Sequence, residues 1–141
     1  MIVGVIKGKI FNESESLFDY ICAHVSSLPN QSILAIASKI VALSQGRVVD
    51  PSEISFSELI AQESEVSIET PFCALTKKDG HWCPNSGIDE SNGNGKYILW
   101  PENPFAVADD LRKKLMKHFC IQDFGIVITD SRVYPLRSGV T

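Results

Sequence analysis

Apolar and polar residues alternate along the chain in patterns that predict short strands and amphipathic helices. Residues 17–25 place Leu17, Tyr20, Ile21 and Val25 at helical spacing. Ser14 and Ser16 both precede this segment, and either suits the N-cap of a helix. Short runs rich in β-branched residues predict strands instead. The expected strands are residues 2–6, 33–41, 66–70, 97–100 and 124–128.

Turn-forming residues separate these segments and mark one hairpin and two further helices. Residues 72–84 are expected to form a hairpin, because Asp79-Gly80 is a favoured two-residue turn. Residues 55–62 predict a short helix. A longer helix is expected to begin at Pro104 with Asn103 as its N-cap, since proline is tolerated in the first turn of a helix.

Strands and helices that alternate with hairpins predict an α+β fold, a mixed β-sheet with flanking helices. The sequence holds no internal repeat, low-complexity tract or linker. With 141 residues it is long enough to bury a core. We therefore expect residues 1–141 to form a single domain.

Composition and charge exclude some classes of function. The formal net charge is −4, and no basic surplus is available for nucleic acid. No apolar run reaches the ~18 to 20 residues of a membrane helix, and the first residues lack the pattern of a signal peptide. We expect a cytoplasmic protein with no nucleic-acid or membrane partner.

The cysteines predict neither a zinc site nor a disulfide framework. Cys22, Cys73, Cys83 and Cys120 are far apart in the sequence, with no C-x-x-C pair and no histidine at finger-like spacing. Isolated buried thiols are the expected outcome.

Oxygen-bearing side chains gather in two segments of the chain. Asp89 and Asn92 lie in a loop too polar to be core, and Asp130 and Ser131 follow the apolar residues 126–128. Together they suggest a site for a hard cation, which prefers oxygen ligands. A second interpretation stays open: aspartate and asparagine often bond only to the local backbone of a turn or helix cap.

Four sequence motifs, in order, resemble the coenzyme F-420:L-glutamate ligase family. They are Ala37-Ser38-Lys39-Ile40-Val41 with Gln45-Gly46-Arg47-Val48-Val49, Asn85-Ser86-Gly87-Ile88-Asp89-Glu90-Ser91-Asn92, Leu99-Trp100-Pro101-Glu102-Asn103-Pro104, and Val127-Ile128-Thr129-Asp130-Ser131. The resemblance spans nearly the whole chain and implies an F-420 ligase-like fold.

The resemblance implies an acid–amino-acid ligase that forms an amide bond at the expense of GTP. Such an enzyme joins L-glutamate to a carboxylate of the coenzyme F-420-0 through an acyl phosphate. It uses Mg²⁺ or Mn²⁺ and is expected to be a homodimer. Phosphoryl transfer of this kind depends on positioning and charge neutralisation, so the resemblance implies no catalytic residue beyond metal and phosphate ligands.

The resemblance also implies the site residues. The metal ligands are expected to be Asp89, Asn92, Asp130 and Ser131. The nucleotide contacts are expected to be Lys9, Ile10, Phe11, Asn12, Ser38 and Lys39. No Walker motif or G-x-G-x-x-G is present, and Lys9 and Lys39 also suit a second interpretation, as solvated surface charges.

The chain departs from the family at three points. Leu43 stands where the family commonly has a lysine. The family usually has a Gly-Arg pair after Asp130, whereas this chain has Arg132-Val133-Tyr134-Pro135-Leu136-Arg137, in which Arg137 is the candidate anion-binding cation. Family members also continue beyond the position of Thr141, so the chain is expected to be a fragment. Two alternatives remain: a relative that extends folate, and a truncated non-catalytic remnant that binds nucleotide or a partner.

Overall fold

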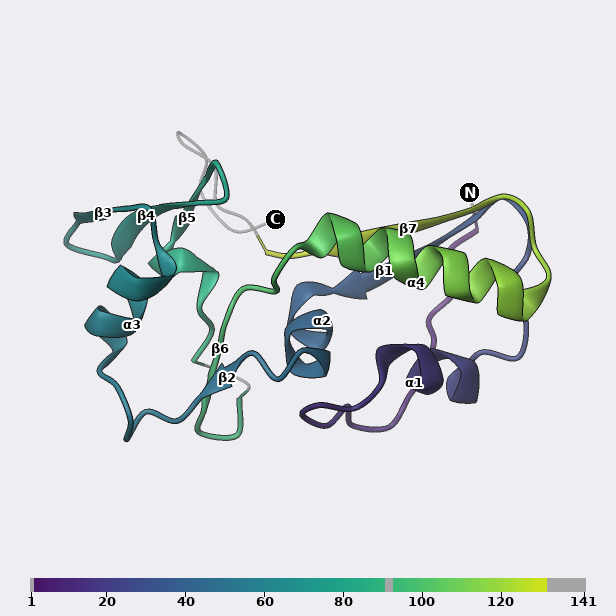
Figure 1. Ribbon diagram of the computed structural model, residues 1–141, viewed down its shortest axis with the longest axis horizontal. Coiled ribbons are helices and arrows are strands. Elements are labelled where there is room, and N and C mark those ends of the chain that lie inside the picture. Colours follow the sequence, from purple (N-terminus) through teal and green to yellow (C-terminus); the bar gives the residue numbers. More distant parts are fainter. Residues whose placement is uncertain (1, 91–92, 132–141) are drawn as a thin grey trace. The chain divides into compact units, whose positions relative to one another are not determined.

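The computed structural model describes residues 2–90 and 93–131 (Figure 1). Chain contacts divide it into two compact units, which are described separately. The first unit comprises Met1–Gly46 and Pro101–Thr129, and the second comprises Arg47–Trp100 and Asp130–Thr141. The single domain expected over residues 1–141 stays a prediction.

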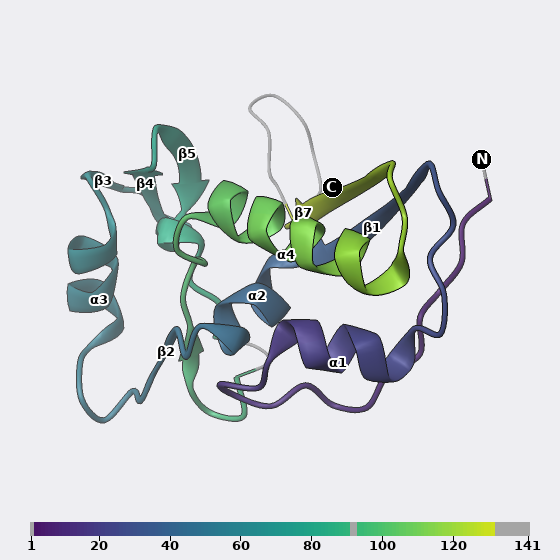
Figure 2. The ribbon, with the colours of Figure 1, turned by 45° about the vertical axis from the view of Figure 1, so that its right-hand side comes forward.

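The first unit is built on two parallel strands and three helices. Its elements are α1 (Leu17–His24), β1 (Ser32–Ala37), α2 (Ser38–Ser44), α4 (Pro104–Phe119) and β7 (Phe124–Thr129). Strands β1 and β7 pair in parallel from Ser32 opposite Phe124 to Ala37 opposite Thr129. Helix α4 runs beside this pair in both ribbon views (Figure 2).

Alternation in β1 and β7 sends one set of side chains into the core of the first unit. Leu34, Ile36 and Phe124 are buried, and they pack with Leu111 and Leu115 of α4. The opposite face of the pair carries Ile33, Ala35, Ala37, Gly125, Val127 and Thr129, and none of these residues is charged. Ile33 remains 70% exposed and Val127 47% exposed, although parallel strands are usually covered on both faces.

The second unit contains short antiparallel pairs around one helix. Its elements are β2 (Val48–Val49), α3 (Phe56–Glu63), β3 (Val66–Glu69), β4 (Ala74–Lys78), β5 (His81–Pro84), the turn Asn85–Gly87 and β6 (Tyr97–Ile98). Strands β3, β4 and β5 form one sheet, and β2 pairs with β6. Leu59, Ile60, Ala74, Ile88 and Leu99 form the core of this unit.

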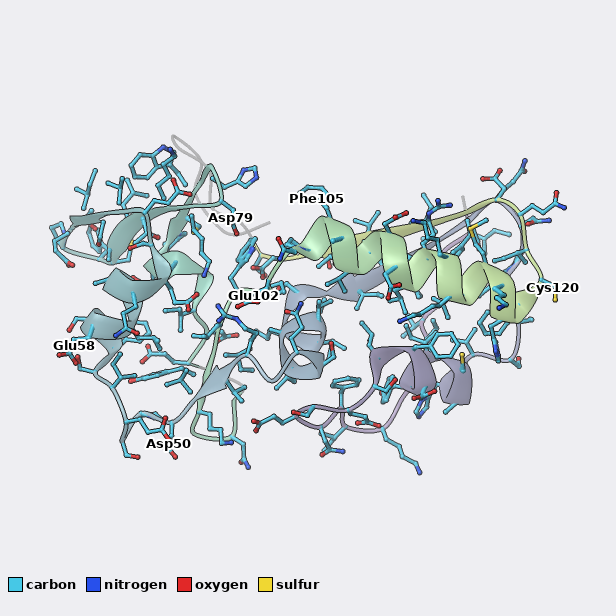
Figure 3. The ribbon with its side chains drawn as sticks, viewed as in Figure 1. Asp50, Glu58, Asp79, Glu102, Phe105 and Cys120 are labelled. Atoms are coloured by element: carbon cyan, nitrogen blue, oxygen red, sulfur yellow. The ribbon has the colours of Figure 1, made fainter. Side chains whose placement is uncertain are left out.

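Several expected elements are confirmed. Ser16 caps α1 by accepting a hydrogen bond from the Asp19 N–H at 3.3 Å. Helix α3 begins after Ser55, which forms a capping box with Glu58. The β4–β5 hairpin turns at Asp79 and Gly80, whose φ angles of 49° and 75° suit the tight turn predicted there, and Asp79 lies at its tip (Figure 3).

The α+β class is confirmed, but the strands differ from the expected single mixed sheet. The described residues contain both parallel and antiparallel pairs, and these lie in three small sheets. The expected strand 97–100 is limited to the two residues of β6.

The strand expected over residues 33–41 is wrong in its second half. The strand ends at Ala37, and α2 begins at Ser38. Val41 and Ala42 are fully buried on this helix. Packing therefore overrides the β propensity of Ile40 and Val41, because propensity is weak compared with burial of an apolar helix face.

The strand expected at residues 2–6 does not form, and the expected N-cap of α4 lacks its side-chain hydrogen bond. Residues 2–6 pair with no strand in the described chain, and Ile2, Val3 and Val5 lie exposed. A β-branched run becomes a strand only when its backbone finds a ladder. Asn103 does precede α4, but its φ of 45° leaves the side chain without a capping bond.

No helix among the described residues is long and apolar enough to cross a bilayer, the longest being the 16 residues of α4.

Candidate functional site

The loop that precedes α1 holds four of the expected nucleotide contacts, and α1 fixes its backbone. The Tyr20 hydroxyl donates to the Lys9 carbonyl at 2.5 Å. The Lys9 N–H reaches His24 Nε2 at 3.4 Å. The Tyr20 ring also meets Phe11 edge-on, with centroids 5.0 Å apart. One face of α1 therefore sets where Lys9 lies.

Close approach of this loop to α1 depends on Gly8. A Cβ at this position would lie 2.0 Å from the Tyr20 hydroxyl oxygen, so no larger residue fits without displacing the tyrosine. The glycine therefore allows the carbonyl of the next residue to reach the Tyr20 hydroxyl.

The side chains of Ile10, Phe11 and Asn12 have different environments. Ile10 is 88% exposed, whereas Phe11 is buried in the core of the first unit. A ligand could therefore contact Phe11 only through its backbone. The Asn12 N–H and Nδ2 both donate to Glu15 Oε2, at 2.9 and 3.4 Å.

Ser38 and Lys39 follow β1 at the carboxyl end of the parallel pair. Ser38 is buried and Lys39 is half-buried, at the start of α2. Because Ala37 pairs with Thr129, β1 and β7 end at the same edge of their sheet. In doubly wound α/β proteins, ligands bind at the carboxyl ends of parallel strands.

Asp130 and Ser131 continue the chain directly after β7. Both are exposed, and Asp130 Oδ1 accepts a hydrogen bond from the Ser131 N–H at 2.8 Å. These two of the four expected metal ligands belong to the second unit, as Asp89 does.

Asp89 lies in the second unit, where its backbone is fixed by β6. Its N–H donates to the Ile98 carbonyl at 2.8 Å, and its carbonyl accepts from the Ile98 N–H at 2.9 Å. Asp89 is half-buried, whereas the neighbouring Glu90 is exposed. Asn92 lies outside the described residues, as does Arg137.

The donor set expected for the metal consists of carboxylate, amide and hydroxyl oxygens. These suit Mg²⁺ or Mn²⁺, which prefer oxygen ligands. Among residues 2–90 and 93–131, no group of three or more histidine, cysteine, aspartate or glutamate side chains is close enough to hold a metal ion. The fit of the expected ligands to Mg²⁺ or Mn²⁺ therefore rests on their oxygen chemistry. Two of these ligands, Asn92 and Ser131, are neither histidine, cysteine, aspartate nor glutamate.

Comparison with known proteins decides the family. Residues 5–141 match the family model described as F420-0:Gamma-glutamyl ligase. The chain belongs to the F420-0:gamma-glutamyl ligase family. The resemblance expected from the sequence motifs is thereby confirmed.

Curated members of the F420-0:gamma-glutamyl ligase family are similar to most of the chain. A coenzyme F420:L-glutamate ligase of Methanosarcina mazei is 32% identical over 158 residues, covering 99% of this chain and 61% of the relative. The enzyme of that name from Methanopyrus kandleri is 30% identical over 138 residues, covering 84% of this chain and 54% of the relative. One from Methanococcus maripaludis is 32% identical over 143 residues, with coverages of 86% and 57%. The chain thus spans little more than half the length of these relatives.

In this member of the family, sequence reasoning missed an ionic cluster inside the second unit. Arg47 Nη2 lies 2.5 Å from Glu63 Oε2, and Lys78 Nζ contacts the same oxygen. Arg47 Nε also donates to the Trp100 carbonyl at 3.3 Å. The three charged side chains are less than a fifth exposed. Their sequence spacing follows no helical or strand period, so no pattern pointed to the cluster.

The two cations determine the ionisation of Glu63. Burial alone would raise the pKa of this carboxyl, but the hydrogen bonds and charges of Lys78 and Arg47 outweigh burial. The pKa of Glu63 therefore lies below its ordinary value. Glu63 is ionised at neutral pH and holds both cations against the end of α3.

Tyr20 and His24 were also missed as supports of the Lys9 loop, although a signal for them existed. They are four residues apart, so they share one face of the predicted helix. The ring centroids of Tyr20 and His24 are 4.3 Å apart, and His24 Nδ1 contacts the Tyr20 carbonyl at 2.7 Å. The sequence did not reveal that the Lys9 loop packs on this face.

Proposed function

We propose that this chain carries part of the active site of a GTP-dependent γ-glutamyl ligase. The reaction would join the amine of L-glutamate to a carboxylate of an F-420-0 type acceptor. The observation that carries the proposal is the family match over residues 5–141, together with relatives named coenzyme F420:L-glutamate ligase. Both describe enzymes that act on glutamate.

The proposed chemistry has two balanced steps. An oxygen of the acceptor carboxylate attacks the γ-phosphorus of GTP, and GDP leaves with the electron pair of the broken P–O bond. The glutamate amine then attacks the acyl carbon, inorganic phosphate leaves, and the amine loses a proton as the amide forms. Activation is needed because a carboxylate resists attack by an amine until its oxygen becomes a good leaving group.

The residues proposed to hold GTP lie in the first unit. The Lys9 loop offers an ammonium group and backbone N–H groups, and Ser38 and Lys39 offer a hydroxyl and a second ammonium group. Lysine binds phosphate as a point charge, so fixing the backbone beneath Lys9 narrows the space its ammonium group samples. The hydrogen bond from Tyr20 to the Lys9 carbonyl supports this role.

The residues proposed to hold Mg²⁺ or Mn²⁺ are Asp89, Asn92, Asp130 and Ser131. When bound, the ion would neutralise charge on the transferring phosphoryl group. In this proposal, Asp89 and Asp130 supply carboxylate oxygens from two separate segments of the chain. The backbone N–H and carbonyl of Asp89 are both hydrogen-bonded to Ile98.

Calorimetric titration of GTP into the protein, with and without Mn²⁺ and with ATP as a control, tests the proposal. We expect GTP to bind at least tenfold more tightly in the presence of Mn²⁺, because a bound divalent cation would offset the negative charge of the phosphates. ATP is expected to bind more weakly than GTP. Binding that is equally weak with and without Mn²⁺ would contradict the proposed site.

A variant of Tyr20 tests whether the Lys9 loop contributes to GTP binding. Tyr20→Phe keeps the ring contacts with Phe11 and His24 but removes the hydroxyl that donates to Lys9. We expect GTP affinity to fall several-fold while the melting temperature changes little, because one exposed hydrogen bond contributes about 1 kcal/mol. Unchanged GTP affinity in this variant would contradict the proposal that the Lys9 loop binds GTP.

We further propose that the chain self-associates through the outer face of the β1–β7 pair. Static light scattering at increasing concentration is expected to show a dimer, and the double variant Ile33→Ser with Val127→Ser is expected to weaken association at least tenfold. Both residues are exposed apolar side chains on a face without charge, and large apolar surfaces are usually covered.

The matched control for this variant is Ile68→Ser with Val66→Ser. These residues of β3 are exposed to 49% and 44%, but they belong to a different sheet. We expect the control to associate as the parent chain does. A parent chain that stays monomeric at high concentration would refute the proposal.

A further inference from the structure

Three consecutive residues, separated from Asp89 only by Ile88, adopt left-handed backbone conformations. The φ angles of Asn85, Ser86 and Gly87 are 49°, 55° and 69°, the longest run of positive φ within the described ranges. For asparagine and serine this conformation costs about 1 kcal/mol or more each. The surrounding structure must therefore stabilise the turn.

Two fully buried hydroxyl groups supply that stabilisation. The Ser86 N–H donates to Thr76 Oγ1 at 2.7 Å, and the Thr76 hydroxyl donates in turn to the Cys83 carbonyl at 2.7 Å. The Ser86 hydroxyl donates to the Ile60 carbonyl at 3.3 Å. These bonds tie the turn to β4, β5 and α3.

The two flanking residues of the turn are held as well. Asn85 Oδ1 accepts from the Ala74 N–H at 2.9 Å. A Cβ added to Gly87 would lie 2.3 Å from Cε3 of Trp100. Only glycine combines this close approach to the indole with a positive φ at no steric cost.

Little freedom remains between this turn and Asp89. Ile88, the single residue between them, is buried in the core of the second unit, and its N–H donates to the Asn85 carbonyl at 3.0 Å. Asp89 then exchanges both backbone hydrogen bonds with Ile98. A displacement of the turn must therefore displace the Asp89 carboxylate or break these bonds.

We propose that the left-handed turn Asn85–Gly87 is a positioning device for the Asp89 carboxylate, with Thr76 and Ser86 as its positioning residues. This inference rests on the proposed function, in which Asp89 binds the metal ion. Neither hydroxyl contacts the ion in this scheme. Their effect passes through the backbone of Ile88.

Paired variants of Thr76 test the proposal. Thr76→Val keeps the side-chain shape but removes the hydroxyl, which leaves the Ser86 N–H and the Cys83 carbonyl without this partner. Thr76→Ser keeps the hydroxyl and loses a methyl group. We titrate Mn²⁺ alone into each protein, at a temperature where circular dichroism shows the variant to be fully folded.

Thr76→Val is expected to weaken Mn²⁺ binding about tenfold, and Thr76→Ser to stay within about twofold of the parent chain. Loss of an outer hydrogen bond that orients a ligand typically costs ~10- to 100-fold in metal affinity. A purely structural hydroxyl would lower the melting temperature and leave the affinity of the folded protein unchanged. Folded Thr76→Val with the parent affinity overturns the proposal.

Amide hydrogen exchange without metal gives a second readout. In Thr76→Val we expect the Asp89 and Ile98 amide hydrogens to exchange at least tenfold faster than in the parent chain. The reference is the Leu59 amide, which bonds to the Ser55 carbonyl in α3 and is expected to change little. Equal acceleration at all three amides indicates general destabilisation of the unit and overturns the proposal.

Two further outcomes are informative. If Thr76→Val does not fold, Ser86→Ala takes its place, and it is expected to weaken Mn²⁺ binding and speed Asp89 exchange about threefold; no change in either overturns the proposal. A parent chain that does not bind Mn²⁺ overturns the proposed metal site. Accelerated exchange confined to Asp89 and Ile98 then still supports the positioning of Asp89, so the two failures are distinguishable.

Discussion

Replacing Asp89 with alanine is expected to reduce Mn²⁺-dependent GTP binding about 100-fold or more. Mg²⁺ and similar ions are usually held by only one or two protein carboxylates, so each one carries a large share of the affinity. The backbone bonds that Asp89 makes with Ile98 do not involve its side chain, and they remain possible in the variant. The measurement is calorimetric titration of GTP with and without Mn²⁺, at a temperature where both proteins are folded.

Glu90 provides the matched control for this loss. It is the next residue in the chain and also a carboxylate, but it is exposed and was not assigned to the metal. Glu90→Ala removes the same formal charge and is expected to retain GTP affinity within about threefold, since an exposed charge that does not ligate the ion acts on it only weakly, through water of high dielectric constant. Equal losses in the two variants would mean that net charge, rather than ligation by Asp89, controls binding.

Replacing Glu63 with glutamine is expected to destabilise the second unit by about 3 kcal/mol at neutral pH. The change leaves Arg47 and Lys78 without their shared carboxylate, and loss of one partner from a buried ion pair typically costs ~3–5 kcal/mol. We take the lower end because these side chains keep some exposure. Urea denaturation followed by tryptophan fluorescence measures the effect, as Trp82 and Trp100 both lie in this unit.

The pH dependence of this difference follows from the lowered pKa of Glu63. A carboxyl whose pKa is lower in the folded chain contributes stability above the pKa of the unfolded chain. That contribution is lost as the pH falls through the folded-state pKa, which lies below the ordinary glutamate value of ~4.3. The difference in unfolding free energy between the parent chain and Glu63→Gln is therefore expected to be largest at pH 7 and to decrease below about pH 4.

Glu65→Gln tests whether the stability loss depends on burial. Glu65 also pairs with a lysine, but Glu65 and Lys77 are 48% and 39% exposed, and their atoms are 3.4 Å apart. Exposed pairs of this kind add little to stability. A loss in Glu65→Gln as large as that in Glu63→Gln would contradict the importance of the buried cluster.

Local patterns predicted the helices and the hairpin better than they predicted the sheets. The cap at Ser16, the Pro104 start of α4 and the Asp79-Gly80 turn depend on residues close together in the sequence, and all three are confirmed. The strand end at Ala37 depends instead on burial of Val41 against distant residues. Local propensity contains no information about such contacts.

The candidate site shows the same division. The sequence motifs identified the family, and they named Asp89 and Asp130 through resemblance to it. They could not reveal the hydrogen bond from Tyr20 to the Lys9 carbonyl or the one from the Ser86 N–H to Thr76. Each of these bonds joins two different segments of the chain, and no periodic pattern in the sequence relates such segments. Supports of this kind emerge only once the packing is known.

The parallel pairing of β1 with β7 also has a consequence for how the chain folds. Its two strands, Ser32–Ala37 and Phe124–Thr129, are far apart in the sequence, and residues 47–100 of the second unit lie between them. During synthesis β1 has no partner until Thr129 has left the ribosome, whereas the β3–β4–β5 hairpins have theirs within a few residues. Because long-range pairing carries a loop-closure cost, the intervening segment is expected to order first and the parallel pair last. Until then, the apolar side chains of β1 would be exposed on the nascent chain, and this stage is the one at which misassociation is most probable.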